Sequence, residues 1–172
     1  FIDRLAETAE GESLPLMVAA EGGALPAALA AARRLTQSGA TALVDLGPSP
    51  SWLADLFDRE RDVEDGDLGL RRDLSTALDI LPSTGRELAA DEIGPLLEAL
   101  AGRYDFVVVH AADWRSPAAT RAMEEMAALL LVAPAAEIAA IEARARAAYR
   151  DAGLAIKAVA LGAEAPPRER AA

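Results

Sequence analysis

The chain alternates short apolar runs with segments whose apolar residues recur every three or four positions. Apolar runs bounded by turn residues are typical of buried strands, and the three-to-four spacing is typical of amphipathic helices. The runs predict strands at residues 14–20, 41–46, 77–82, 106–110, 128–133 and 156–161. The periodic segments predict helices at residues 24–38, 51–57, 91–102, 117–126 and 135–152, with Asp91 as a helix cap.

This alternation predicts the fold class, an α/β domain with three layers: a mainly parallel sheet with helices on both faces. The uninterrupted apolar run at 106–110 fits a strand that is covered on both sides. We expect residues 1–13 to form a lead-in helix or linker, 14–162 a single domain, and 163–172 a disordered tail. The mixed-charge run at 58–73 is expected to be a solvated loop or surface helix.

Composition narrows the function classes. The 172 residues are enough for one domain with a proper core. With 17 basic and 28 acidic side chains, the net charge of −11 opposes binding to nucleic acid or to an anionic membrane surface.

There is no cysteine and only one histidine, so we expect no metal site. No apolar run reaches the length of a membrane span, so direct membrane insertion is not expected. A first residue other than methionine suggests a piece of a longer protein.

A glycine turn follows the first predicted strand, where α/β domains often hold a phosphate group. A phosphate-binding loop has the pattern G-x-x-x-x-G-K-[ST], in which the lysine and hydroxyl contact phosphates and Mg²⁺. Here Gly22 and Gly23 are followed by Ala24 and Leu25, and no lysine precedes Lys157. The residues alone therefore favour a strand-to-helix turn without ligand chemistry.

Two ionisable residues end predicted strands at the same edge of the sheet. Asp45 ends the second strand, where it is either a helix cap or a relic of a site. His110 ends a central strand three residues before Asp113. A His–Asp pair can perform acid–base chemistry. No nucleophile or metal ligand is evident beside it, so a satisfied, partly buried histidine is the favoured interpretation.

Two tryptophans lie on loops at this edge. Trp52 and Trp114 are the kind of aromatic residue that anchors protein interfaces, and Asp113 and Arg115 flank the second one. We therefore predict a partner contact formed by Trp52, Asp113, Trp114 and Arg115. In the alternative hypothesis, both tryptophans pack over an unused ligand pocket and fill it.

Four segments, in this order, resemble the ParA/MinD-like P-loop ATPases with a deviant Walker motif. Within that superfamily they are most similar to the cytoplasmic domain of bacterial polysaccharide tyrosine autokinases and their chain-length-determinant relatives. The segments that carry the resemblance are AAARRLTQSGATALVD at 30–45, LDILPSTG at 78–85, LEALAGRYDFVVVH at 97–110, and the strand–helix–strand unit at 129–162. The resemblance implies a P-loop NTPase-like fold.

Transferred residue by residue, the family's nucleotide site is mostly lost. Ala24 and Leu25 match the P-loop lysine and hydroxyl positions, and His110 matches the Walker B aspartate. Asp45 is the only acidic site residue that is kept, and the tyrosine-rich tail of the autokinases is missing. The resemblance therefore implies no catalytic residue, no cofactor, and a vestigial nucleotide site at Gly22, Gly23, Asp45 and His110.

The expected function is that of a non-catalytic pseudo-ATPase or pseudokinase domain in bacterial exopolysaccharide biosynthesis and export. The implied partners are polysaccharide export or co-polymerase proteins of the inner membrane, or further copies of the chain. The implied location is the cytoplasm, tethered to the inner membrane through parts of the protein outside this chain. The alternatives are a divergent nucleotide-binding ATPase or tyrosine autokinase, and a ParA/MinD-like localisation factor of another system.

Overall fold

The computed structural model describes residues 2–8, 13–20, 24–49, 52–53, 69–83, 85 and 88–160. A seven-stranded sheet forms the centre of this part of the chain. The strands are β1 (Leu14–Ala20), β2 (Thr41–Asp45), β3 (Arg71–Asp73), β4 (Leu78–Leu81), β5 (Phe106–Ala111), β6 (Ala128–Ala133) and β7 (Ala155–Ala160). They are ordered β3-β4-β2-β5-β1-β6-β7 across the sheet. β3 runs antiparallel to β4, and the other neighbouring strands are parallel.

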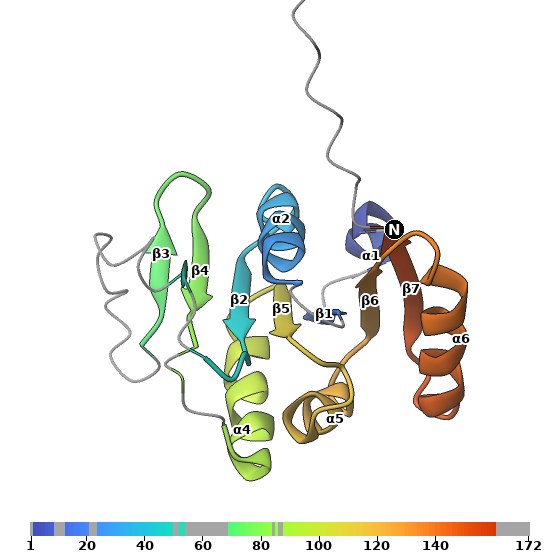
Figure 1. Cartoon of the computed structure of the whole chain (residues 1–172). Coiled ribbons are helices and arrows are strands. Elements are labelled where there is room, and N and C mark those ends of the chain that lie inside the picture. Colours follow the sequence, from blue (N-terminus) through green and yellow to red (C-terminus); the bar gives the residue numbers. More distant parts are fainter. Residues whose placement is uncertain are drawn as a thin grey trace, which may run out of the picture.

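Helices cover both faces of this sheet, as Figure 1 shows. They are α1 (Ile2–Thr8), α2 (Leu25–Leu35), α4 (Ala90–Ala101), α5 (Pro117–Met123) and α6 (Ile138–Ala148). α1 and α2 pack with one apolar cluster, while α4, α5 and α6 pack with a second cluster on the other face. The three-layer α/β fold predicted from the sequence is thereby confirmed. Among the described residues, no helix is both long enough and apolar enough to cross a membrane.

The central strands are apolar because they have no solvent-facing side. Every residue of β2, β5 and β6 is buried, as expected for parallel strands between two helical layers. The neighbouring edge strand β7 instead alternates buried Ile156 and Ala158 with exposed Ala155 and Lys157. This difference in pattern marks β7 as a strand whose second face is only partly covered.

Several predicted helix boundaries need correction. The helix predicted at 135–152 spans only Ile138–Ala148, and α5 ends at Met123 rather than at residue 126. Asp91 is not the cap of α4. The N-cap is Ala89, whose backbone N–H donates to the Glu92 carboxylate at 2.8 Å. Of the helix predicted at 51–57, only residues 52 and 53 are described, and the predicted tail at 163–172 lies outside the described residues.

The last three residues of the mixed-charge run form a strand, which corrects for them the prediction of a solvated loop or surface helix, while residues 58–68 of the run lie outside the described residues. Arg71–Asp73 forms β3, and Asp73 is only 2% exposed. Its carboxylate accepts hydrogen bonds from the backbone and hydroxyl groups of Ser75, from the Thr76 hydroxyl, and from Arg33 of α2 at 2.8 Å. The charge is therefore buried because four neighbouring groups satisfy it, which local sequence pattern does not reveal.

A second carboxylate fixes β3 to β4. Asp79 of β4 is 2% exposed and binds the Arg72 guanidinium through two bonds, Nε to Oδ1 at 2.6 Å and Nη2 to Oδ2 at 2.7 Å. The Tyr104 hydroxyl donates to the same carboxylate at 2.8 Å. Burial and this negative partner both raise the pKa of Tyr104 above its usual range. Two arginine–carboxylate pairs thus hold a strand of only three residues.

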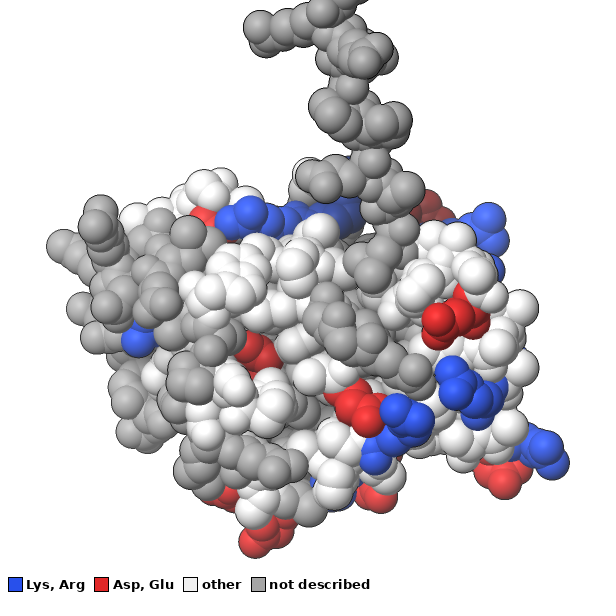
Figure 2. All heavy atoms as spheres, in the orientation of Figure 1, with Lys and Arg blue, Asp and Glu red and all other residues white. Residues whose placement is uncertain are grey.

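Charged side chains of both signs also lie next to each other on the surface (Figure 2). Arg34 pairs with Asp3 at 2.9 Å and thereby joins α2 to α1. Arg121 pairs with Glu124 at 2.5 Å within α5 and the turn that follows it. Exposed pairs of this kind contribute at most about 1 kcal/mol each.

We predict that Asp73→Asn destabilises the fold in a pH-dependent way. Burial of the Asp73 carboxyl raises its pKa, but the hydrogen bonds from Ser75, Thr76 and Arg33 outweigh that effect and lower the pKa to about 2. Because the pKa is lower in the folded state, the stabilisation is complete at neutral pH and is lost as pH falls from about 4 to 2. Urea unfolding should show the variant about 2 kcal/mol less stable at pH 7, with the gap closing towards pH 2. A gap that does not change with pH would contradict this account.

Candidate functional site

The candidate site lies where β2 and β5 end at the carboxyl edge of the sheet. In the parallel register of these strands, Asp45 is the direct partner of His110, and Val18 of β1 is the partner of His110 on its other side. Leu43 and Val108, which precede the pair by two residues, belong to the apolar cluster under α2. Because side chains alternate along a strand, Asp45 and His110 lie on that same face.

A short hydrogen bond joins the two side chains. The Nδ1 atom of His110 lies 2.7 Å from Oδ1 of Asp45, and the side chains are only 6% and 2% exposed. The same carboxylate oxygen accepts the backbone N–H of Gly47 at 2.8 Å. An ionised carboxylate only accepts, so Nδ1 carries the proton in this bond. The sequence-based suggestion that His110 pairs with Asp113 is therefore wrong, because the register places Asp45 beside it.

Gly47 allows the chain to turn closely over this carboxylate. A Cβ atom at position 47 would lie 3.0 Å from Oδ1 of Asp45, closer than most real Cβ contacts. The Gly47 carbonyl accepts the Ser83 hydroxyl at 2.6 Å, which connects the turn to the end of β4. Asp45 therefore supports the turn that follows β2, and its Oδ1 is engaged by two donors.

The second ring nitrogen of His110 has no hydrogen-bond partner within the described residues, although it is buried. Nε2 accepts a hydrogen bond in neutral imidazole and donates one in imidazolium. This nitrogen is therefore the ring atom of His110 whose hydrogen-bonding capacity no described residue uses. Across the described residues, no group of three or more His, Asp or Glu side chains is placed to hold a metal ion.

The start of α2 is apolar where a phosphate site needs polar groups. Ala24 is the N-cap and provides no side-chain hydrogen bond, while Pro26 lies in the first turn. Ala24 is 0% and Leu25 is 7% exposed, and both pack in the apolar cluster on this face. The positions matched to the P-loop lysine and hydroxyl are thus part of the core. Gly22 and Gly23 lie outside the described residues.

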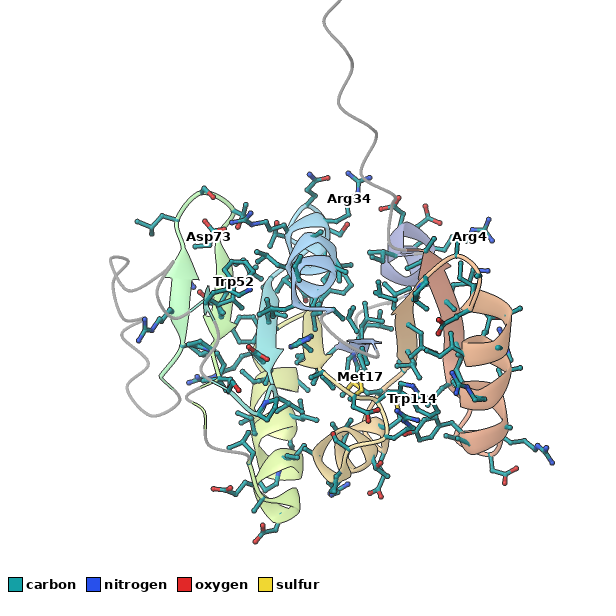
Figure 3. All side chains as sticks on the ribbon, viewed as in Figure 1. Arg4, Met17, Arg34, Trp52, Asp73 and Trp114 are labelled. Atoms are coloured by element: carbon teal, nitrogen blue, oxygen red, sulfur yellow. The ribbon has the colours of Figure 1, made fainter. Side chains whose placement is uncertain are left out.

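The four residues predicted as a partner contact do not form one surface. Trp52 is 45% exposed, whereas Trp114 is 4% exposed. Figure 3 shows Trp52 on the side of β2 and β4, and Trp114 beside α5 and α6. The hypothesis that both rings pack over one pocket is therefore wrong, and of the two tryptophans only Trp52 presents much of its ring at the surface.

Trp114 is buried because α6 brings a tyrosine to it. The rings of Trp114 and Tyr149 meet edge to face, with centroids 6.0 Å apart, and the Tyr149 hydroxyl donates to the Trp114 carbonyl at 3.1 Å. The Arg115 guanidinium lies 5.8 Å from the Trp114 ring centre and 3.0 Å from the Asp113 carboxylate. Hydrogen bonding from Arg115 lowers the pKa of Asp113. This cluster joins the loop after β5 to α6.

Comparison with solved structures shows that the chain shares the α/β fold of ParA/MinD-type ATPases and of tyrosine-kinase domains, the fold that the sequence resemblance implies. The VpsO kinase domain matches with a TM-score of 0.71 and 18% identity, over 92% of this chain and 88% of that domain. The kinase domain of Escherichia coli tyrosine kinase ETK matches with a TM-score of 0.67 and 19% identity, over 89% and 69% of the two chains. A ParA family ATPase from Chlorobium tepidum matches with a TM-score of 0.65 and 16% identity, over 87% and 73%.

The amino-acid sequence itself matches no protein-family model and no curated protein. At identities below about 20%, the structural matches establish the shared fold. The roles of Asp45, His110 and the start of α2 must therefore be argued from this chain's own contacts.

We predict that His110 and Asp45 are energetically coupled. His110→Phe keeps an aromatic ring at this position but leaves the buried Asp45 carboxylate with fewer donors, which costs about 2 kcal/mol or more of unfolding free energy. Asp45→Asn in the same background removes the unpaired charge and should recover part of that loss. Urea unfolding of the two single variants and the double variant would give a coupling free energy of about 1–3 kcal/mol. Simple additivity would show that the hydrogen bond carries no stabilisation.

Proposed function

We propose that this chain is a non-catalytic pseudo-ATPase or pseudokinase domain that acts as an interaction or regulatory module in bacterial exopolysaccharide biosynthesis and export. Its partners are polysaccharide export or co-polymerase proteins of the inner membrane, to which it is tethered through parts of the protein outside this chain. The sequence resemblance to polysaccharide tyrosine autokinases supports this role, as does the fold shared with the VpsO and ETK kinase domains.

The observation that carries the proposal is the buried hydrogen bond between His110 and Asp45. Phosphoryl transfer depends on positioning and on neutralising phosphate charge with Mg²⁺ and a lysine. Here the Asp45 oxygen Oδ1 is engaged by His110 and Gly47, and His110 stands where the resemblance places a second carboxylate. An imidazole N–H that donates to a carboxylate competes directly with a cation for the same oxygen.

The apolar start of α2 supports the same conclusion. Ala24 and Leu25 offer neither a positive charge nor a hydroxyl to a triphosphate, and both are buried. The net charge of −11 adds a long-range repulsion of nucleotides. Binding and chemistry would both have to proceed without the groups that P-loop enzymes use for them.

One observation favours an alternative, a divergent nucleotide-binding protein. The Nε2 atom of His110 is buried and has no partner among the described residues. As imidazolium, this atom would donate a hydrogen bond to a phosphate oxygen. The fold shared with a ParA family ATPase equally fits a localisation factor of another system.

Calorimetric titration with ATP and ADP, with and without Mg²⁺, separates these functions. We predict no binding heat up to millimolar nucleotide for the wild-type chain, because the phosphate-binding groups are missing. The same titration of His110→Ala is the matched control. Micromolar binding to the wild type that is lost in His110→Ala would establish the nucleotide alternative and overturn the non-catalytic module.

A second prediction concerns the partner surface. The purified domain should bind the cytoplasmic segments of the inner-membrane co-polymerase from the same organism, with an affinity that MgATP does not change. Trp52→Ala should weaken this binding about tenfold or more, because exposed tryptophans are frequent interface anchors. Leu74→Ala is the control, since Leu74 is also exposed, at 68%, but lies in the turn after β3. Binding that requires ATP, or that is indifferent to Trp52, would contradict this arrangement.

A further inference from the structure

A cavity of about 440 Å³ lies between α4 and α5, two helices that Figure 1 shows beside each other on one face of the sheet. Its floor includes Pro15 and Val107, which are direct partners near the starts of β1 and β5. The cavity therefore opens near the amino edge of the sheet, whereas Asp45 and His110 lie at the carboxyl edge. Its volume is in the range of about 300–1,000 Å³ that is typical of binding sites in proteins.

Two poor helix formers stand next to each other inside α4, and both line this cavity. They are Gly94 and Pro95, and each destabilises a helix interior relative to alanine. Gly94 lets the guanidinium of Arg121 lie against α4, because a Cβ atom at position 94 would be 2.7 Å from its Nη2 atom. Helix propensity therefore gives way where the two helices and Arg121 form the cavity.

Negative charge is in excess around the cavity. Glu98 of α4, Arg121 of α5 and Glu125 of the following turn line it. The Nη1 atom of Arg121 binds Glu124 at 2.5 Å and Glu125 at 3.4 Å, so its positive charge already has two carboxylate partners. The side chains of Glu124 and Glu125 are 66% and 48% exposed. Three carboxylates thus surround one guanidinium and remain accessible to a ligand.

Much of the remaining lining is apolar. Leu97 and Val107 belong to the core cluster on this face, and Pro95 and Ala101 are exposed at the mouth of the cavity. A ligand that fits this lining combines an apolar stem with a positive head, as lysine and arginine side chains do. An anion would meet the carboxylates. A purely apolar group would strip water from them without offering a hydrogen bond in return.

We propose that this cavity binds a basic segment of a partner protein, with one lysine or arginine side chain entering beside Glu98 and Glu125. The net charge of −11 attracts such a segment over a longer range. The proposal deepens the proposed function and rests on it for the source of the segment, because cytoplasmic segments of inner-membrane proteins are enriched in lysine and arginine. The contact is separate from Trp52, which lies on the side of β2 and β4.

The test is a fluorescence-anisotropy titration with a labelled synthetic peptide in which lysine and serine alternate. Glu98→Gln with Glu125→Gln removes two negative charges at the cavity. Glu137→Gln with Asp151→Asn is the charge-matched control, because these exposed residues stand before and after α6, which does not line the cavity. At physiological ionic strength, charges more than about 8 Å from the peptide are largely screened. We expect the dissociation constant to rise about tenfold in the first variant and less than about twofold in the second.

Three further variants test the cavity and the sign of its ligand. Ala101→Phe fills the mouth of the cavity without changing charge, and Ala99→Phe places the same ring elsewhere on the exposed surface of α4. Only Ala101→Phe should weaken peptide binding, by about tenfold. Arg121→Gln removes the positive charge that lines the cavity and should tighten binding of the lysine peptide. Thermal unfolding verifies that each variant is folded.

Several outcomes would overturn this inference. They are no peptide binding to the wild type, equal weakening in the two charge-matched variants, unchanged binding in Ala101→Phe, and weaker binding in Arg121→Gln. Because the probe is a synthetic peptide, the titration judges the cavity separately from the proposed function. Nucleotide binding, or a failure to bind the co-polymerase segments, would contradict the proposed function without changing the peptide result.

Discussion

The parallel alignment of β2 with β5 is the constraint on which the candidate site depends. It makes Asp45 and His110 neighbours in the interior, where an unpaired charge is costly and a hydrogen-bonded pair is not. The carboxylate also holds the Gly47 turn, which in turn binds the end of β4 through Ser83. Three hydrogen bonds, from His110 to Asp45, from Gly47 to Asp45 and from Ser83 to Gly47, thus connect β2, β5 and the residues after β4 at the carboxyl edge of the sheet.

The pairing of Asp45 with His110 leaves fewer charged groups available to a ligand, and this supports the proposed role. A nucleotide site keeps its charges available for phosphate and Mg²⁺, and those charges need solvent or ligand to satisfy them. Here the charge is satisfied within the protein, and the adjacent helix start is closed by Ala24 and Leu25. Under the proposed function, the corner gains stability from this pair and does not bind nucleotide. What remains is the Nε2 atom of His110, unpartnered among the described residues, on which the nucleotide alternative depends.

The sequence pattern predicts the strands that are continuous apolar runs. It does not predict burial that depends on partners distant in the sequence. β5 and β6 are continuous apolar segments and were predicted nearly to the residue. β3 is missed because the partners that satisfy the buried Asp73 include Arg33, forty positions away in the chain. The Asp45–His110 pair was missed because strand order cannot be read from one sequence, although both residues were expected at strand ends. Trp114 was expected at the surface because nothing in its own loop indicates Tyr149.

Carboxylates paired with arginines recur at both edges of the sheet, and the composition explains why. Aromatic residues are only 4% of the chain, so its edges have little aromatic surface with which to pack. Arg72 holds Asp79 at one edge through two parallel bonds, and Arg146 contacts both Glu142 and a strand carbonyl at the other. A lysine offers a single point charge and cannot make such forked contacts. At these two edges of the sheet, arginine therefore makes contacts that lysine could not make.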